Sequence, residues 1–141
     1  MTMPSTTGTA KLPSVAALVG RLIFAGVFAM AAIFKFSNMD GTADYIAAAG
    51  FPFSLILAWV AAILEVILAL CFLSGAYFSE AAIVAAIYVV FLGFAFHGPS
   101  HWSANQAEFG FFVDHFTFLA GLLFAACYGP GSLLALKRRL F

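Results

Sequence analysis

Charge is what this sequence lacks most. Only 9% of its 141 residues are Asp, Glu, Lys or Arg, and six acids balance six bases, so the formal net charge is zero. Soluble globular domains carry roughly a quarter charged residues. This scarcity, together with 65% hydrophobic residues and a mean hydropathy of +1.08, excludes a soluble globule and indicates a membrane protein. The neutral balance also excludes a basic face for nucleic acid.

Cysteine is scarce as well, and the two cysteines are isolated. Cys71 and Cys127 stand alone in apolar segments, and no CxxC motif occurs. This argues against a membrane enzyme that makes disulfides, because such an enzyme needs paired, exchangeable thiols. Haem motifs, flavin fingerprints and cysteine clusters are missing too, so any redox role needs a partner or a diffusible substrate as electron donor.

What the sequence has instead is four long apolar runs. A membrane-spanning helix needs about 20 predominantly apolar residues. The predicted spans are residues 13–36, 53–74, 79–97 and 109–128. Glycine and proline end three of them, at Gly75, at Gly98 with Pro99, and at Gly129. None of the runs alternates polar and apolar residues as a membrane β-barrel would. The predicted fold class is therefore all-α, an integral membrane four-helix bundle.

Shorter segments flank and interrupt the spans. Between the first two lies TADYIAAAG, which is too short to cross a membrane and predicts an interfacial helix from Thr42 to Ala49, capped by Asp40. The domain prediction is a disordered tail over 1–12, a transmembrane domain over 13–131 and a basic cytoplasmic tail over 132–141. A cleaved signal peptide is the alternative for the first run, although Arg21 would interrupt its apolar core.

The distribution of basic residues predicts how the chain is oriented. Lys11 precedes the first run and Lys137, Arg138 and Arg139 follow the last, whereas the loop over 97–108 has no Lys or Arg. Basic residues concentrate on the cytoplasmic side of membrane proteins. We therefore expect both termini in the cytoplasm, which an even number of spans allows.

Glu65 lies alone near the middle of the second run and needs a partner. An ionised, unpaired carboxylate at that depth costs several kcal/mol. With a helix rise of about 1.5 Å per residue, Arg21 comes out roughly 10 Å and Glu65 roughly 13 Å from the cytoplasmic ends of their helices. The sequence therefore predicts a structural ion pair between Arg21 and Glu65.

A second group of ionisable residues is expected nearer the opposite membrane surface. It consists of Lys35, His97, Asp114 and His115. Two interpretations stay open: a ligand-binding pocket, in which histidine suits proton exchange near neutral pH, or a plain salt bridge between Lys35 and Asp114 with interfacial histidines. A metal site is a weaker alternative. His97 and His101 stand four residues apart, but Gly98 and Pro99 break the helix between them, and no metal site is predicted.

The stretch from Arg21 to Gly75 carries a family resemblance. It reads RLIFAGVFAMAAIFKFSNMDGTADYIAAAGFPFSLILAWVAAILEVILALCFLSG, with Lys35 ending the first run and Glu65 inside the second. This pattern resembles the DoxX family of small four-helix membrane proteins, and the likeness extends over residues 18–128. The last run departs from it, because Asp114 and His115 stand where members tend to have a Lys-Asn pair.

The resemblance implies a multi-pass protein of the bacterial inner membrane. Some DoxX members are subunits of thiosulfate:quinone oxidoreductase, and others are partners of oxidative-stress or sulfur-redox enzymes. We therefore expect a quinone-linked subunit of a membrane redox complex, with lipid and other membrane subunits as partners and without a bound metal or flavin. In this hypothesis Lys35, His97, Asp114 and His115 hold the quinone headgroup. The alternatives are a non-catalytic assembly subunit, or a small transporter or proton channel that would form only as an oligomer.

Overall fold

The computed structural model describes residues 11–136 and 138–140, and its regular structure there is helical. The helices are α1 (Lys11–Ser37), α2 (Met39–Ala48), α3 (Ser54–Ser74), α4 (Phe78–His97) and α5 (Ala107–Tyr128), with a 3-10 turn η1 (Pro99–His101). In the described part, α1, α3, α4 and α5 are long and apolar enough to cross a membrane. The predicted all-α membrane bundle is confirmed. Of the tail expected over 1–12, residues 1–10 lie outside the described residues, and 11 and 12 belong to α1.

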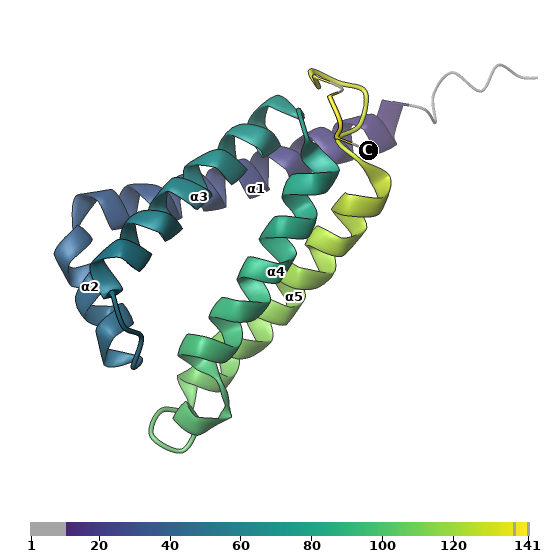
Figure 1. Ribbon diagram of the computed structural model, residues 1–141. Coiled ribbons are helices and arrows are strands. Elements are labelled where there is room, and N and C mark those ends of the chain that lie inside the picture. The colour runs from purple at the N-terminus through teal and green to yellow at the C-terminus, as the bar shows by residue number, and fades with distance from the viewer. Residues whose placement is uncertain (1–10, 137, 141) are drawn as a thin grey trace, which may run out of the picture.

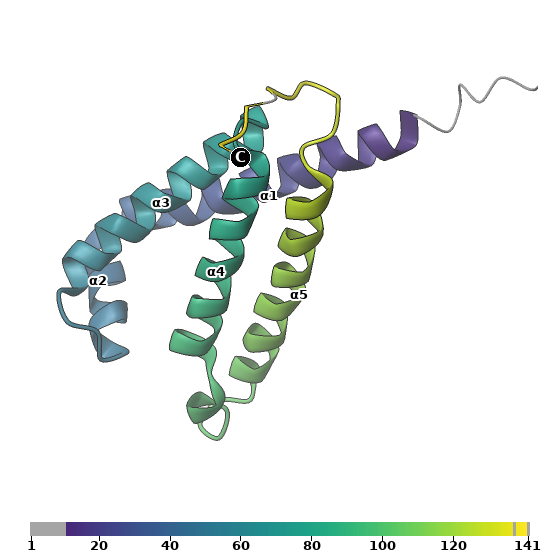
Figure 2. The ribbon, with the colours of Figure 1, turned by 45° about the vertical axis from the view of Figure 1, so that its right-hand side comes forward.

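The spanning helices form two antiparallel pairs, α1 with α3 and α4 with α5 (Figure 1). The pairs meet where the turn between α3 and α4 lies and diverge toward α2 and η1, so the molecule has the shape of a V (Figure 2). We call these two ends the joined end and the open end. The described chain both begins and ends at the joined end, and the first turns of α1 project beyond it (Figure 2).

A cluster of phenylalanine rings packs between the two helix pairs. Phe72 of α3 lies 5.3 Å from Phe24 and 5.6 Å from Phe28 of α1, between ring centroids. Phe118 of α5 lies 5.4 Å from Phe24, and Phe78 of α4 lies 5.4 Å from Phe72. Helix α4 contributes four buried alanines to the same core: Ala81, Ala82, Ala85 and Ala86. Small residues of this kind let membrane helices approach closely.

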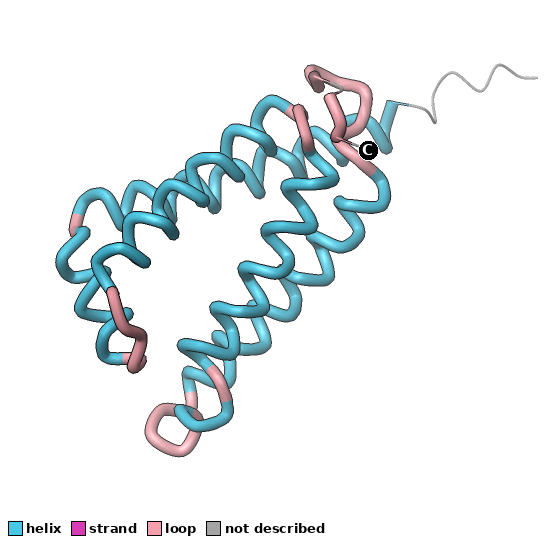
Figure 3. The backbone as a smooth tube through the Cα atoms, in the orientation of Figure 1, coloured by secondary structure: helices cyan, strands magenta, loops and turns pink. Residues whose placement is uncertain are grey.

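Helix α2 packs on the open end, at the place predicted for the interfacial helix. The ring of Tyr45 in α2 stacks on the ring of Phe96 in α4, with centroids 5.0 Å apart. This contact joins α2 to the second helix pair. Figure 3 shows α2 as a short helix set off by loops from α1 and α3. It begins at Met39 rather than Thr42 because Asn38 is the cap: its Oδ1 accepts from the Gly41 N–H at 3.0 Å. Asp40, the predicted cap, lies inside the first turn, where its charge favours the helix dipole.

The C-terminal segment folds back over the turn between α3 and α4. The Leu136 N–H donates to the Ser74 carbonyl at 2.9 Å, and the Tyr77 N–H donates to the Arg138 carbonyl at 2.8 Å. The basic tail expected over 132–141 is therefore attached to the bundle in its described part. Its cytoplasmic location stays a prediction.

Candidate ligand-binding groove

A groove of about 580 Å³ is lined by all four spanning helices. This size falls within the about 300–1,000 Å³ usual for small-molecule sites. Helices α1 and α5 contribute most of its lining, and α3 and α4 contribute Glu65, Tyr88, Val89 and Leu92. We call it the α1–α5 groove. Its ionisable side chains are Lys35, Glu65, Tyr88, Asp114 and His115.

Glu65 accepts two hydrogen bonds on one oxygen. The Lys35 ammonium donates to Glu65 Oε1 at 2.8 Å, and the Tyr88 hydroxyl donates to the same oxygen at 2.8 Å. The Glu65 side chain is 2% exposed, whereas that of Lys35 is 22% exposed, so the carboxylate is buried and the ammonium reaches the surface of the groove. The predicted ion pair between Arg21 and Glu65 is wrong, because Lys35 takes that place.

Arg21 lies at the joined end instead. Its Nη2 donates to the Leu134 carbonyl at 2.8 Å, and its Nη1 lies 3.5 Å from the Pro130 carbonyl. A Cβ atom added to Gly75 would lie 2.8 Å from Arg21 Nη1, so Arg21 is level with the end of α3. The depth estimate failed because it placed the starts and ends of the helices at one membrane level, whereas α1 begins well beyond the end of α3 (Figure 2).

His115 and Asp114 bring two further ionisable groups to the groove from α5. The Phe111 carbonyl lies 2.7 Å from His115 Nδ1 and can only accept, so Nδ1 carries a proton. The neutral ring then presents Nε2 as an acceptor. Asp114 makes no hydrogen bond or ion pair with any described residue, so the alternative salt bridge between Lys35 and Asp114 does not form.

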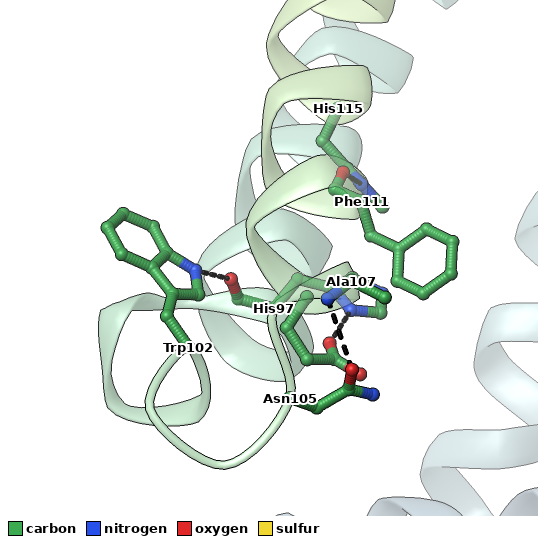
Figure 4. Close-up of polar contacts among 7 residues, drawn as sticks. His97, Trp102, Asn105, Ala107, Phe111 and His115 are labelled. Atoms are coloured by element: carbon green, nitrogen blue, oxygen red, sulfur yellow. Dashed lines mark hydrogen bonds and ion pairs between the residues drawn. The ribbon is translucent and has the colours of Figure 1, made fainter.

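His97 lies beside the α1–α5 groove rather than in its lining. Its Nδ1 is 2.6 Å from Glu108 Oε2, and its carbonyl accepts from Trp102 Nε1 at 2.9 Å (Figure 4). These bonds close the connection between α4 and α5. The centroid of the His97 ring also lies 5.1 Å from that of the His115 ring. His97 therefore packs against His115, which does line the groove. Of the four predicted ligand-binding residues, the structure brings Lys35, Asp114 and His115 together.

Sequence reasoning missed Tyr88. It is the single phenol in the predicted span over 79–97, and a buried phenol hydroxyl needs a hydrogen-bond partner in apolar surroundings. That signal was sufficient to place Tyr88 with the ionisable residues. Its partner proves to be Glu65.

Tyr45 of α2, which lies outside the spans, and Glu108 in the first turn of α5 line a smaller hollow of about 250 Å³ at the open end. Burial, and secondly the negative charge of Glu108, raise the pKa of the Tyr45 phenol, so this group stays neutral at physiological pH. Over residues 11–136 and 138–140, no three His, Cys, Asp or Glu side chains lie together as a metal-binding group.

The groove residues fit a quinone headgroup by the chemistry of their donors and acceptors. Lys35 Nζ carries N–H groups beyond the one directed at Glu65, and a quinone carbonyl accepts such donors. His115 Nε2 and the Asp114 carboxylate are acceptors that could bind the hydroxyl groups of the reduced form. The remaining lining is mostly apolar, as a lipid-soluble ring requires.

The comparison with protein families matches residues 16–98 to the DoxX family. The match covers more than half of the chain and includes Lys35, Glu65 and Tyr88, but it ends before Asp114 and His115. No curated protein and no solved structure matches the sequence. The chain therefore belongs to the DoxX family.

Proposed function

We propose that this protein is a quinone-linked subunit of a membrane redox complex and that the α1–α5 groove holds the quinone headgroup. One observation carries the proposal: five ionisable side chains from four spanning helices line a single groove of about 580 Å³. Ionisable groups inside a membrane are expensive and are usually functional. One salt bridge uses only Lys35 and Glu65, which leaves Asp114 and His115 for another task.

The groove opens on the outer surface of the bundle. Val27 of α1 and Asp114 and Thr117 of α5 line it and are exposed, so it is a side-facing groove rather than an enclosed chamber. A ligand dissolved in the lipid can enter sideways and leave its apolar tail among the acyl chains. This access favours a lipid-soluble quinone over a water-soluble substrate.

The chain's own residues supply binding and proton transfer. A bound quinone would supply two-electron redox chemistry. Lys35 donates a hydrogen bond to a carbonyl of the ring, and Glu65 with Tyr88 fixes the position of the ammonium. His115 Nε2 accepts a proton at the opposite wall, and Asp114 lies next to it in sequence for transfer toward the surface.

The proposed location is the bacterial inner membrane, with the joined end on the cytoplasmic side. Arg138 and Arg139 follow the last span at that end, and the loop at the open end has no Lys or Arg. Because the sequence holds no haem, flavin or cysteine-cluster motif, electrons must come from a partner subunit or a diffusible donor.

A non-catalytic assembly subunit is the second candidate, and a different surface favours it. A groove of about 430 Å³ between α1 and α3 is lined by apolar residues, among them the small residues Ala25, Gly26 and Ala29. Small residues at a helix surface allow a partner helix to pack closely. Copurification of a stoichiometric membrane partner without quinone would favour this role.

The test is to purify Asp114→Asn and His115→Ala in mild detergent and to measure the quinone extracted per protein. Asp44→Asn and His101→Ala are matched controls, because both residues are exposed and lie outside the groove lining. Loss of one hydrogen bond to a charged or proton-exchanging group should lower quinone retention by about tenfold. Retention equal to wild type in both groove variants would contradict the proposal.

A further inference from the structure

Three arginines, Arg21, Arg138 and Arg139, lie at the joined end. The described ion pairs are Lys35 with Glu65 and His97 with Glu108, and neither involves Arg21, Arg138 or Arg139. Arg21 is 1% exposed, and its Nε has no hydrogen-bond partner among the described residues. A buried cation without a counter-charge is costly, so this end of the molecule is suited to an anion from outside the chain.

A cavity of about 240 Å³ lies at this end, between the turn from α3 to α4 and the C-terminal segment. Its lining includes Arg138 and Arg139, which carry guanidinium groups, and three residues with hydroxyl groups, Ser79, Tyr128 and Ser132. We call it the joined-end cavity. Guanidinium and hydroxyl groups are donors to phosphate oxygens, and no Asp or Glu is among the described residues of the lining.

The buried Arg21 guanidinium lies directly behind this cavity. Pro130 and Gly75 belong to the cavity wall, and Arg21 Nη1 lies 3.5 Å from the Pro130 carbonyl. A Cβ atom on Gly75 would come within 2.8 Å of the same nitrogen. The positive charge of Arg21 therefore adds to that of Arg138 and Arg139 at short range, where the low dielectric screens it little.

The backbone that carries the two exposed arginines is held in place. The Arg138 carbonyl accepts from the Tyr77 N–H at 2.8 Å, and the Leu140 N–H donates to Glu80 Oε1 at 2.6 Å. The second bond also engages Glu80, the acid in the first turn of α4, which lies outside the cavity lining. Phe78 and Ser79 of that turn do line the cavity, so the cavity lies at the N-terminal end of a 20-residue helix, where the helix dipole favours an anion.

We propose that the joined-end cavity binds a phosphate group at the membrane surface. The source is either the headgroup of an anionic phospholipid or free phosphate, since both present the same oxygens to an arginine fork. The cavity lies where the spans end, at the level of lipid headgroups, and basic pockets at this level bind anionic lipids. The site is separate from the α1–α5 groove, so the proposal does not depend on the quinone function.

The experiment titrates the full-length protein in neutral detergent with phosphatidylglycerol, phosphatidylcholine or inorganic phosphate. Bound lipid is counted by native mass spectrometry, and the thermal unfolding midpoint is recorded. The test variant is Arg138→Gln with Arg139→Gln. The matched control replaces both with Lys, which keeps the charge but removes the planar fork.

We expect phosphatidylglycerol to bind and to raise the midpoint, and phosphatidylcholine to do neither. The double Gln variant should bind roughly 20-fold more weakly, because each basic residue near an anionic membrane surface contributes on the order of fivefold. Competition by inorganic phosphate at equal concentration would identify free phosphate as the ligand, and its failure would identify the lipid. Equal binding by wild type and the double Gln variant would overturn the site. Full binding by the double Lys variant would also overturn it, because general surface charge would then suffice.

Discussion

Glu65 is the residue on which the α1–α5 groove depends. The sequence predicts that this acid needs a partner, because it lies in the middle of an apolar span, and that expectation is confirmed. The partner itself could not be predicted. Helix rise gives the depth of a residue within its own helix, but the alignment of two helices depends on where each one begins. Since α1 begins well beyond the end of α3, Lys35 rather than Arg21 reaches Glu65.

The Lys35–Glu65 pair should behave as a coupled unit. Lys35→Met alone leaves a buried carboxylate without its cation and should lower the free energy of unfolding by about 3–5 kcal/mol. Lys35→Met combined with Glu65→Leu should cost much less, because no charge is then left buried. Equilibrium unfolding in mixed micelles measures the free energy of unfolding of each variant. If the double variant loses as much stability as the two single variants together, the two residues do not interact.

Tyr88 should contribute less to the free energy of unfolding than Lys35 does, but its contribution should be measurable. Tyr88→Phe removes one hydrogen bond to Glu65, which is worth about 1.5–3 kcal/mol for a charged acceptor. Tyr128→Phe is the control, since that side chain is 83% exposed. Equal unfolding free energies for the two variants would refute a role for the Tyr88 hydroxyl.

At the level of single elements, glycine and proline predict the helix ends well. Gly75 ends α3 and Gly98 with Pro99 ends α4, as the sequence predicts. The start of α2 was predicted less well, because Asn38 and Asp40 are both good caps and only the backbone shows that Asn38 lies outside the helix. The docking of the C-terminal segment has no sequence signal, since it uses backbone groups of Ser74, Tyr77 and Leu136.

Gly75 is predicted to be indispensable for the turn between α3 and α4. Its φ of 78° is left-handed, and an added Cβ atom would lie 2.8 Å from Arg21 Nη1 and 2.9 Å from Ala135 Cβ. Gly75→Ala should therefore lower the thermal midpoint, with about 1 kcal/mol from the backbone alone and more from the clash. Gly110→Ala in α5 is the control, because nothing lies within 4 Å of its added Cβ atom. A midpoint for Gly75→Ala as high as that of the control would mean that the turn tolerates a side chain.

For the whole molecule, four spans follow from the apolar runs, but the V shape does not. The pairing of α1 with α3 and of α4 with α5, and the phenylalanine cluster around Phe72, come from packing between distant segments. The side-facing groove results from that arrangement. The sequence could therefore name Lys35, Asp114 and His115 as candidates without showing that they share one groove.

Orientation is a prediction for the whole molecule too. With the joined end in the cytoplasm, a reporter enzyme that is active only in the periplasm should be inactive when fused after Phe141 and active when inserted in the loop over 102–106. A reporter active only in the cytoplasm should give the opposite pattern. Periplasmic activity at the C-terminus would reverse the proposed orientation.

Photocrosslinking would show whether the α1–α5 groove holds a quinone headgroup. A short-tailed benzoquinone with a photoreactive group on its ring is added to the purified protein, illuminated, and located by mass spectrometry of the peptides. We expect labels on α1 near Lys35 and on α5 near Asp114 and His115, and we expect excess unlabelled quinone to suppress them. Labels confined to the outer face of α1 and α3, or labels that excess quinone leaves unchanged, would contradict the proposal.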